Sequence, residues 1–578
     1  SQRCAEACAG GGPQNIRRHH GVAEHSLIGR AGDGQRRTHQ RCRRNAGQTD
    51  GKHHLLVADG PVRSAAGEPC PQHMQELTRR QTVAPHQHGT QQKQQAHSAQ
   101  QEKAPPVGPP GHQLLHGSVP RRIGDDVIGA GPGGIFSAYE LIHQNKNLKI
   151  AVFEEGYPLE KRHCPIDGKK VPSCIKCPTC AIMSGFGGAG AFSDGKYNIT
   201  NDFGGTLYEY IGKEEALDLM RYVDEINMTH GGAETKLYST AGTHFKKICM
   251  QNKLKLLDAS VRHLGTDINY VVLENLYNEL KDQIDFYFQT PVTKIERLGD
   301  NNYRIHYHDT FADCTKCVVS VGRIGSKWME SICKDLEIPT NSNRVDLGVR
   351  VELPAVIFSD LTDELYESKI VYRTEKFEDN VRTFCMNPYG IVVNENTNGI
   401  VTVNGHSYED PAQQTENTNF ALLVAKHFSE PFKDSNGYGE SIARLSNMLG
   451  GGVIVQRFGD LVRGRRSTVK RIEEGLVRPT LSATPGDLSL VLPKRILDGI
   501  IEMIYALDKI APGTANDDTL LYGVEVKFYN MEVELDENLE SCHKGLYIIG
   551  DGSGVTHSLS HASASGVFVA RRIMEGIE

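Results

Sequence analysis

A glycine-rich turn is the part of the sequence best suited to hold a ligand. It consists of Gly129, Gly131, Pro132, Gly133 and Gly134. Gly129 would allow a tight turn after a strand, Gly131 would let the backbone approach a pyrophosphate, and Gly134 would let the next helix pack closely on the sheet. The N-terminus of that helix would hold the phosphates. Glu154 ends the next apolar run, where its carboxylate could accept ribose hydroxyls. These residues predict a dinucleotide site, and the alternative is a turn without a ligand.

A second glycine-rich stretch, residues 185–195, contains too many glycines for a regular helix or strand. Glycine lets a backbone lie close to a flat ring or a phosphate, so we interpret this stretch as a loop that faces a cofactor. The contacts expected from it are Gly187, Gly188, Gly190, Ser193 and Asp194. The alternative is a flexible linker. Lys196 follows the loop and is expected to be solvated.

The C-terminal part of the chain favours a flavin over a nicotinamide. A short apolar strand ends at Gly550–Asp551, and a helix follows from about residue 562 with Gly566 on it. This resembles the element of FAD-binding Rossmann proteins in which the aspartate holds a ribityl hydroxyl. Val292, after an expected strand, and Gly322, after another, resemble two further FAD-contacting elements. The cofactor implied by this resemblance is FAD.

Only one Gly-x-Gly-x-x-Gly turn, that of Gly129 to Gly134, lies between an expected strand and an expected helix. Reductases with paired dinucleotide domains need a second such turn for NAD(P)H. NAD(P)H could therefore donate electrons only by reaching the flavin through the other domain, and otherwise the donor is a different molecule.

Three longer motifs, at residues 180–196, 262–267 and 382–388, resemble a family of poorly characterised bacterial FAD-dependent dehydrogenases. The resemblance covers about residues 125–578. It implies a single Rossmann-type FAD domain and a redox reaction, without a settled substrate. The chain departs from the family pattern at residues 556–561 and in a shortened first strand.

Three side chains near the expected flavin contacts could act as acid, base or nucleophile. They are Cys385, His557 and His561. A histidine can relay a proton near neutral pH while electrons move to or from a flavin. The alternative for Cys385 is a small buried apolar side chain.

Four cysteines precede the second glycine-rich stretch with the spacing C-x9-C-x2-C-x2-C: Cys164, Cys174, Cys177 and Cys180. Two-residue spacings let thiolates converge on one point, so an iron–sulfur cluster or a structural zinc could bind there. The alternatives are a dithiol relay to the flavin and unmodified structural thiols.

Four arginines cluster around two glycines: Arg457, Arg463, Arg465 and Arg466. The planar guanidinium suits carboxylate or phosphate, so these residues are candidates for binding an anionic substrate. The alternative is a solvated basic loop.

These segments predict an α/β protein with a discontinuous Rossmann-type FAD domain and an inserted α+β substrate domain. The expected FAD-domain parts are residues 123–205, 265–345 and 540–578, with a helical insertion at 206–264 and the substrate domain at 346–539. One defect stands out. A buried parallel strand needs several apolar residues, yet Asp125 and Asp126 precede only Val127 and Ile128.

Residues 1–122 are rich in Gln, His, Arg, Gly and Pro and show no apolar periodicity. Such a segment lacks the apolar surface to form a core, so we expect a disordered extension or residues from outside the natural reading frame. Its arginines contrast with the overall net charge of −7 and could instead form a nucleic-acid-binding arm. The 14 irregularly spaced cysteines fit a reducing compartment, and neither a signal segment nor a membrane span is visible. We expect a cytoplasmic protein.

The sequence therefore predicts an FAD-dependent oxidoreductase acting on a small-molecule substrate or electron donor, with neither a membrane nor nucleic acid as partner. Two alternatives stay open. One is an FAD-dependent protein that modifies nucleic acid such as tRNA, and the other is a non-catalytic FAD-binding regulatory protein.

Overall fold

The computed structural model describes residues 124–165, 170, 175, 177–397, 399–408, 411–428 and 431–576, with the backbone alone for Thr397. The predicted extension at residues 1–122 and Cys174 lie outside these ranges. Within the described residues, no helix is both long and apolar enough to cross a lipid bilayer.

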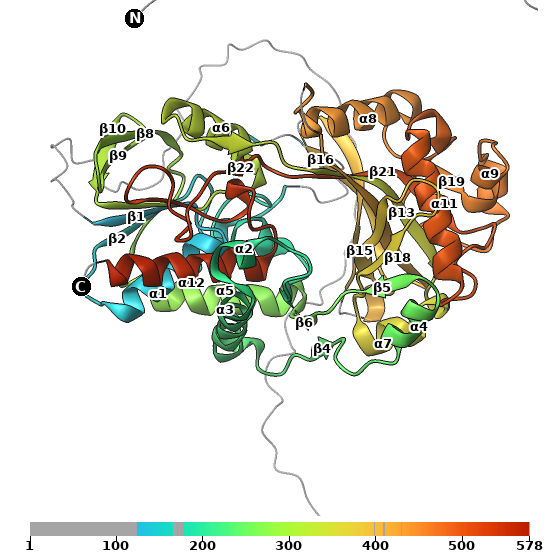
Figure 1. Ribbon diagram of the computed structural model, residues 1–578, viewed down its shortest axis with the longest axis horizontal. Helices are drawn as coiled ribbons and strands as arrows, with labels where there is room; N and C mark the ends of the chain where they lie inside the picture. Colours follow the sequence, from blue (N-terminus) through green and yellow to red (C-terminus); the bar gives the residue numbers. More distant parts are fainter. Residues whose placement is uncertain are drawn as a thin grey trace, which may run out of the picture. The chain divides into compact units, whose positions relative to one another are not determined.

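A five-stranded parallel sheet gathers segments that lie far apart in the sequence (Figure 1). Its order is β23 (Leu546–Ile548), β11 (Lys316–Val319), β1 (Asp125–Ile128), β2 (Ile150–Phe153) and β7 (Asp285–Tyr287). The central strand β1 pairs with β11 on one side and β2 on the other, so that Val127 lies opposite both Val318 and Val152.

The short first strand is confirmed, and the structure shows how it forms. Asp125 and Asp126 lie inside β1 and are only 5% and 2% exposed. Burial raises the pKa of Asp125, while a hydrogen bond donated by Thr315 Oγ1 (3.1 Å) opposes the rise. The strand thus accommodates a carboxyl group where an apolar residue would be expected.

Alternate residues of these strands enter different cores, as the pleat requires. Val127 packs with the helices α1 (Pro132–Gln144), α3 (Lys213–Asn227), α5 (Gly265–Leu280) and α12 (Leu559–Glu575). Ile128 packs on the opposite face with α6 (Ser326–Asp335) and the antiparallel strands β8 (Val292–Gly299), β9 (Asn302–Tyr307) and β10 (Thr310–Cys314). The parallel sheet is therefore covered on both faces.

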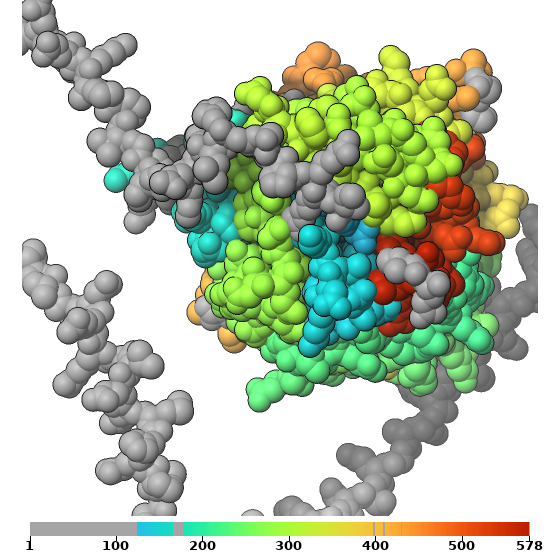
Figure 2. Space-filling view, turned by 90° about the vertical axis from the view of Figure 1, so that its left-hand side faces the viewer, coloured from blue at the N-terminus to red at the C-terminus, as the bar shows by residue number. Residues whose placement is uncertain are grey.

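The two helices from opposite ends of the described chain pack directly on each other. In Figure 2 the early segment, in blue, adjoins the C-terminal segment, in red. A Cβ added to Gly566 of α12 would lie 2.2 Å from the carbonyl oxygen of Gly133 in α1. The sequence predicts a cofactor contact for Gly566, whereas the structure explains this glycine by helix packing.

A second lobe is built on an eight-stranded, mainly antiparallel sheet. Its order is β20 (Thr484–Pro485), β19 (Ile454–Arg457), β21 (Leu520–Phe528), β13 (Val345–Pro354), β18 (Asn417–Lys426), β15 (Asn380–Asn387), β14 (Ile370–Arg373) and β5 (Leu254–Leu256). The predicted amphipathic helix near 494–510 is confirmed as α11 (Lys494–Asp508), which buries Ile500 and Ile504 in the core of this lobe. Strand β5 shows that the 206–264 segment, expected to be helical, also contributes to this sheet.

Alternation along β13 places one charged side chain on the face opposite that core. Val349 and Val351 join the core, and Arg350 between them points the other way. The hairpin of β16 (Ile391–Thr397) and β17 (Ile400–His406) meets Arg350 there, since a Cβ on Gly405 would lie 1.9 Å from its guanidinium.

The remaining elements are short or peripheral. They are α2 (Leu207–Ile211), α4 (Phe245–Gln251), α7 (Ser359–Leu365), α8 (Ser435–Gly450), α9 (Phe458–Val462), α10 (Val469–Glu473), η2 (Gly188–Phe192), the sheet of β3 (Lys196–Ile199), β6 (Ser260–His263) and β4 (Leu237–Ser239), and the pair β12 (Thr340–Asn341) and β22 (Glu532–Val533).

The packing of the glycine turn gives a first prediction. Replacing Gly134 with alanine should lower the free energy of unfolding by about 1–3 kcal/mol, because the new Cβ would lie 2.0 Å from the carbonyl oxygen of Gly129. Gly299→Ala is the matched control, since its Cβ would meet no described atom within 4 Å. Urea unfolding of both variants measures the difference, and equal stability would contradict this account of the turn.

Candidate functional site

The glycine turn leaves open space at one position. A Cβ on Gly129, which has φ of +100°, would lie 2.3 Å from the carbonyl oxygen of Ser320, so packing alone requires glycine there. Gly131 has an extended backbone, and the nearest described atom to its Cβ position is Gly188 Cα at 4.0 Å. Protein packing therefore does not require glycine at 131, whereas a ligand approaching the N-terminus of α1 would.

The second glycine-rich stretch packs onto this turn. The amide of Gly187 donates to the carbonyl oxygen of Ala130 at 2.8 Å, and a Cβ on Gly188 would lie 3.1 Å from Gly131 Cα. The hydroxyl of Ser193 donates to the carbonyl oxygen of Gly190 at 2.8 Å. The two predicted cofactor segments thus form one backbone surface, which we call the glycine cradle (residues 129–134 and 185–190).

Glu154 ties the cradle together. Its Oε2 accepts from the amide of Ala130, and its Oε1 accepts from the amides of Gly156 and Gly185, each at 2.8 Å. The side chain is buried, and burial raises its pKa against these three donors. A carboxylate has about four acceptor positions, so capacity remains for one more donor.

The predicted Gly550–Asp551 element adjoins a second set of charges. Arg323 Nε donates to Asp551 at 2.8 Å, and His557 Nδ1 lies 3.0 Å from the same carboxylate. Burial disfavours the ionised form of Asp551, but Arg323 and His557 outweigh it and lower the pKa. Gly322, next to Arg323, has no described atom within 4 Å of its Cβ position.

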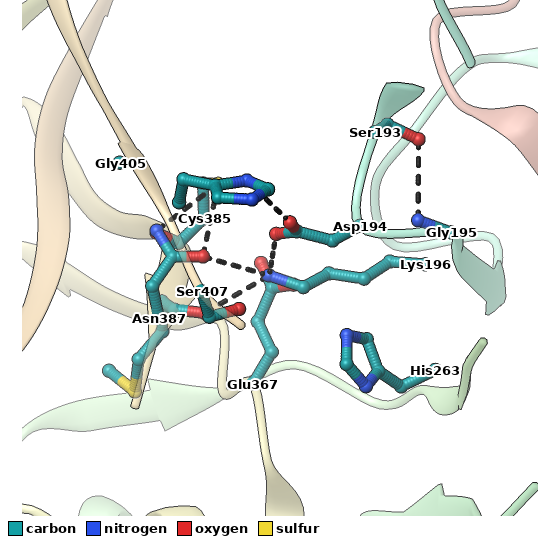
Figure 3. A network of polar contacts seen from close by, with 12 residues as sticks. Ser193, Asp194, Gly195, Lys196, His263, Glu367, Cys385, Asn387, Gly405 and Ser407 are labelled. Atoms are coloured by element: carbon teal, nitrogen blue, oxygen red, sulfur yellow. Dashed lines mark hydrogen bonds and ion pairs between the residues drawn. The ribbon is translucent and has the colours of Figure 1, made fainter. Parts of the chain in front are cut away.

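The two lobes meet in a cluster of charged and polar side chains (Figure 3). We call it the seam cluster: Asp194, Lys196, Glu367, Lys369, Cys385, Asn387 and His406. Lys196 lies at its centre and donates to the carbonyl oxygen of Met386 (3.1 Å) and to Asn387 Oδ1 (3.2 Å). It also forms ion pairs with Asp194 (3.3 Å) and Glu367 (3.4 Å). These carboxylates overcome burial and hold the pKa of Lys196 well above its usual value.

Asp194 joins the seam cluster to the hairpin. Its carboxylate lies 3.0 Å from His406 Nδ1 and is also within electrostatic range of His263. Burial opposes ionisation, but Lys196 and the histidines hold the pKa of Asp194 far below its usual value.

Lys369 shares Glu367 with Lys196. It forms an ion pair with Glu367, and its ammonium lies over the rings of Phe384 (4.2 Å) and Phe203 (5.0 Å). Burial lowers the pKa of Lys369, which the carboxylate of Glu367 only partly offsets.

Cys385 lies at a distortion of β15. Its φ is +45°, and the pairing of β15 with β18 shifts register between Phe384 and Asn387. The guanidinium of the fully buried Arg350 donates to the Cys385 carbonyl oxygen at 2.8 Å and pairs with Glu525 at 3.3 Å. Positive φ at a non-glycine residue in a bulge is common near functional sites because it redirects a side chain.

Beside the seam cluster lies a stacked pair of rings. Tyr366 stacks on His263 with ring centroids 4.2 Å apart, and the Tyr366 hydroxyl lies 3.0 Å from His263 Nε2 and 3.2 Å from Ser407 Oγ.

The two predicted catalytic histidines lie at the start of α12. His561 is fully buried, its Nδ1 lies 3.0 Å from Ser558 Oγ, and burial lowers its pKa to about 3. It is therefore neutral at pH 7. His557 is held by Asp551 as described. The catalytic roles of Cys385, His557 and His561 stay predictions.

Aspartates within the protein neutralise the charge of most of the predicted arginine cluster. Arg463 pairs with Asp517 and Arg465 with Asp460, each at 2.7 Å. Arg457 Nε donates to Asp518 at 2.9 Å. Arg466 is exposed. The structure therefore gives no support to an open anion pocket here.

The geometry adds no support to two further predicted sites, the metal site of the four cysteines and the adenine contact of Val292. Among the described residues, no three His, Cys, Asp or Glu side chains are placed to hold a metal ion, and Cys174 lies outside them. Val292 is buried at the start of β8, and its adenine contact stays a prediction.

Sequence reasoning missed most of the seam cluster. Lys196 was expected to be solvated, and Glu367, Lys369 and His406 lie in no recognisable motif. The adjacency of Lys196 to Asp194 was the one available signal, because a charged pair directly after a glycine loop is costly to bury without partners.

Comparisons with known proteins agree with a flavoprotein. Residues 347–528 match the family model described as "FAD-dependent protein, C-terminal domain-like". A protein of Clostridium beijerinckii is 27% identical over 473 residues, which cover 78% of this chain and 80% of that protein. The matched family segment contains most of the second lobe.

Solved structures that align with the chain include a glycine oxidase from Geobacillus kaustophilus, at 10% identity, 79% coverage of this chain, 95% of that chain and a TM-score of 0.32. Another is 2,6-dihydroxypyridine-3-hydroxylase from Arthrobacter nicotinovorans, at 9% identity, 79% and 84% coverage and a TM-score of 0.34. These TM-scores are too low to establish a shared fold.

The seam cluster predicts acid-sensitive stability. Burial raises the pKa of Glu367, but Lys369 and Lys196 outweigh it and lower the pKa to about 2. Ionised Glu367 therefore stabilises the fold above its unfolded pKa of about 4.5, and this stabilisation is lost as pH falls toward about 2. Glu367→Gln should cost about 3 kcal/mol at pH 7, because it leaves buried lysines unpaired. Unfolding of both proteins from pH 7 to 3 should show this difference shrinking, whereas parallel stability curves would contradict it.

Proposed function

We propose that the protein is an FAD-dependent oxidoreductase of a small-molecule substrate, with a Rossmann-type FAD domain and its reaction site at the seam cluster. The observation that carries the proposal is the glycine cradle: Gly131 lies at the N-terminus of α1 with open space at its Cβ position. Anionic phosphates are stabilised at such a helix terminus. The match of residues 347–528 to an FAD-dependent C-terminal domain supports the same cofactor.

The residues present fit an adenine-dinucleotide flavin. The cradle would hold the pyrophosphate, Glu154 has acceptor capacity left for a ribose hydroxyl, and Asp551 would face the ribityl chain. Gly322 resembles Gly131 in having no described neighbour that requires glycine. These features support FAD and bear on neither an iron–sulfur cluster nor a zinc ion.

The seam cluster supports redox catalysis over a purely regulatory role. A bound flavin would supply the transfer of an electron pair, and the protein would supply orientation and electrostatics. Here Lys196 fixes the end of the cradle loop relative to β15, and a seam histidine beside the ionised Asp194 provides a group that can hold a proton. Buried, strained and charged groups gathered at one place are expensive to maintain for structure alone.

The proposal predicts that the full-length protein purifies with a flavin absorption spectrum and releases FAD, not FMN, on denaturation. The cradle and Glu154 would bind the pyrophosphate and adenosine of FAD. FMN has neither of these groups. Chromatography of the released cofactor checks this. Colourless protein that binds no added FAD would overturn the proposed function.

Gly131→Ala should separate cofactor binding from folding. Its extended backbone accepts alanine and no described atom crowds the Cβ, so the FAD-free protein should keep its melting temperature. The methyl group would obstruct the pyrophosphate and weaken FAD binding more than about tenfold, or about 1.4 kcal/mol. Equilibrium titration with FAD measures this, with Gly299→Ala as the control that should bind FAD normally. Unchanged affinity in Gly131→Ala would place the cofactor elsewhere.

A further inference from the structure

The pair formed by His406 and Asp194 has a defined chemistry. Because Lys196 and the neighbouring histidines hold the pKa of Asp194 far below its usual value, its carboxylate is ionised and can only accept hydrogen bonds. His406 Nδ1 lies 3.0 Å from Asp194 Oδ1 as an ion pair, and this approach favours the form of the ring with a hydrogen on Nδ1. In the neutral ring this leaves a lone pair on Nε2.

The position of the pair suits a group that meets substrate. Asp194 follows the cradle loop, whereas His406 ends β17 in the second lobe. The His406 side chain is 28% exposed while Asp194 is 10% exposed, so the imidazole is the member that a small molecule can reach. The ring of Tyr408 meets it edge-on at 4.7 Å, which limits its rotation.

Other charged and titratable groups surround the pair from every neighbouring element. They are Lys196 on β3, His263 on β6, Tyr366 and Glu367 before β14, Cys385 on β15 and Tyr408 after β17. Lys196 is already committed to four acceptors, and His263 is engaged by Tyr366. His406 is therefore the imidazole of this cluster best placed to exchange a proton.

We propose that His406 is the acid–base residue of the proposed flavin reaction, with Asp194 as its positioning residue. The substrate class that follows is a small organic molecule whose redox change moves a proton together with an electron pair, such as alcohol and carbonyl or quinol and quinone. This inference rests on the proposed function. It disfavours a carrier that takes one electron and no proton.

The proton balance of such a step is simple. When a quinone is reduced to a quinol it gains two electrons and two protons. A bound flavin would supply both electrons and one proton, and Nε2 of protonated His406 would supply the second proton, which water would then restore. In the oxidising direction the substrate O–H proton passes to the Nε2 lone pair as the electron pair leaves.

The predicted histidines are the rivals for this role. His561 is fully buried, and its low pKa prevents it from donating a proton near pH 7. His557 has a similar carboxylate partner in Asp551, but that carboxylate is shared with Arg323, and the His557 side chain is only 9% exposed. His557→Gln is therefore the informative comparison.

Two electron acceptors test the proposal with the FAD-loaded, chemically reduced full-length protein. Duroquinone needs protons with its electrons, and its methyl groups prevent addition to thiols, whereas ferricyanide takes electrons alone. His406→Gln should slow reoxidation by duroquinone about 100-fold, a typical loss for general acid–base catalysis, and leave the ferricyanide rate little changed. Asp194→Asn should slow the duroquinone reaction less, because the imidazole remains.

Controls make each outcome decisive. His308→Gln, at an exposed residue in the turn between β9 and β10, should match wild type with both acceptors. Equal slowing with both acceptors in His406→Gln would mean a structural role and overturn the inference. Slowing in His557→Gln instead of His406→Gln would overturn it in favour of the rival. If the protein holds FAD and neither variant responds, the acid–base inference fails while the proposed function stands.

A second measurement needs neither substrate nor turnover. Nitrogen NMR of histidine-labelled protein should show the neutral His406 ring with its hydrogen on Nδ1, the tautomer that Asp194 requires. Asp194→Asn removes the obligatory acceptor and should raise the fraction with hydrogen on Nε2. A wild-type ring with its hydrogen on Nε2 would overturn the pairing itself.

Discussion

The ammonium of Lys196 is the interaction on which the arrangement of the site depends. It bonds to acceptors from both lobes: Asp194 beside the cradle loop, and Glu367, the Met386 carbonyl and Asn387 in the second lobe. A buried ammonium with this many partners has no alternative of similar energy, since releasing it would leave several buried polar groups unsatisfied. One side chain therefore holds the cradle loop and β15 in a fixed position relative to each other.

Within the second lobe, Arg350 likewise fixes the relative position of several segments. Its guanidinium holds the Cys385 carbonyl, Asn419 and Glu525, and Gly405 lets the hairpin strand β17 lie directly on it. The bulge at Cys385 and the placement of His406 next to Gly405 thus have a common origin. Any larger residue at 405 would lift the hairpin from Arg350, and His406 would move away from Asp194. Strain at Cys385 persists because these contacts over-determine it.

The parts of the fold that local physics dictates were predictable from sequence. The glycine turn, the short first strand and helix α11 follow from backbone conformation and periodicity, which act over a few residues. The seam cluster did not follow, because Lys196 and Glu367 are joined across 171 positions and neither carries a motif. Gly566 is predicted to contact the cofactor, and in the structure the close packing of α12 on α1 also requires glycine at this position. Sequence patterns identify that a backbone is constrained, but not by which partner.

The charges of the seam cluster are balanced within the protein, and this shapes what the site can do. Lys196 pairs with Asp194 and Glu367, Lys369 pairs with Glu367, and Arg350 pairs with Glu525. The attraction of a charged substrate is therefore weak compared with the free-energy cost of separating these pairs. The arginines near α9 are likewise paired with aspartates. What the seam offers instead is a fixed carboxylate that sets the tautomer of an accessible imidazole. A site of that kind selects substrates by their need for a proton at a defined position, which fits the chemistry of a flavin better than electrostatic capture would.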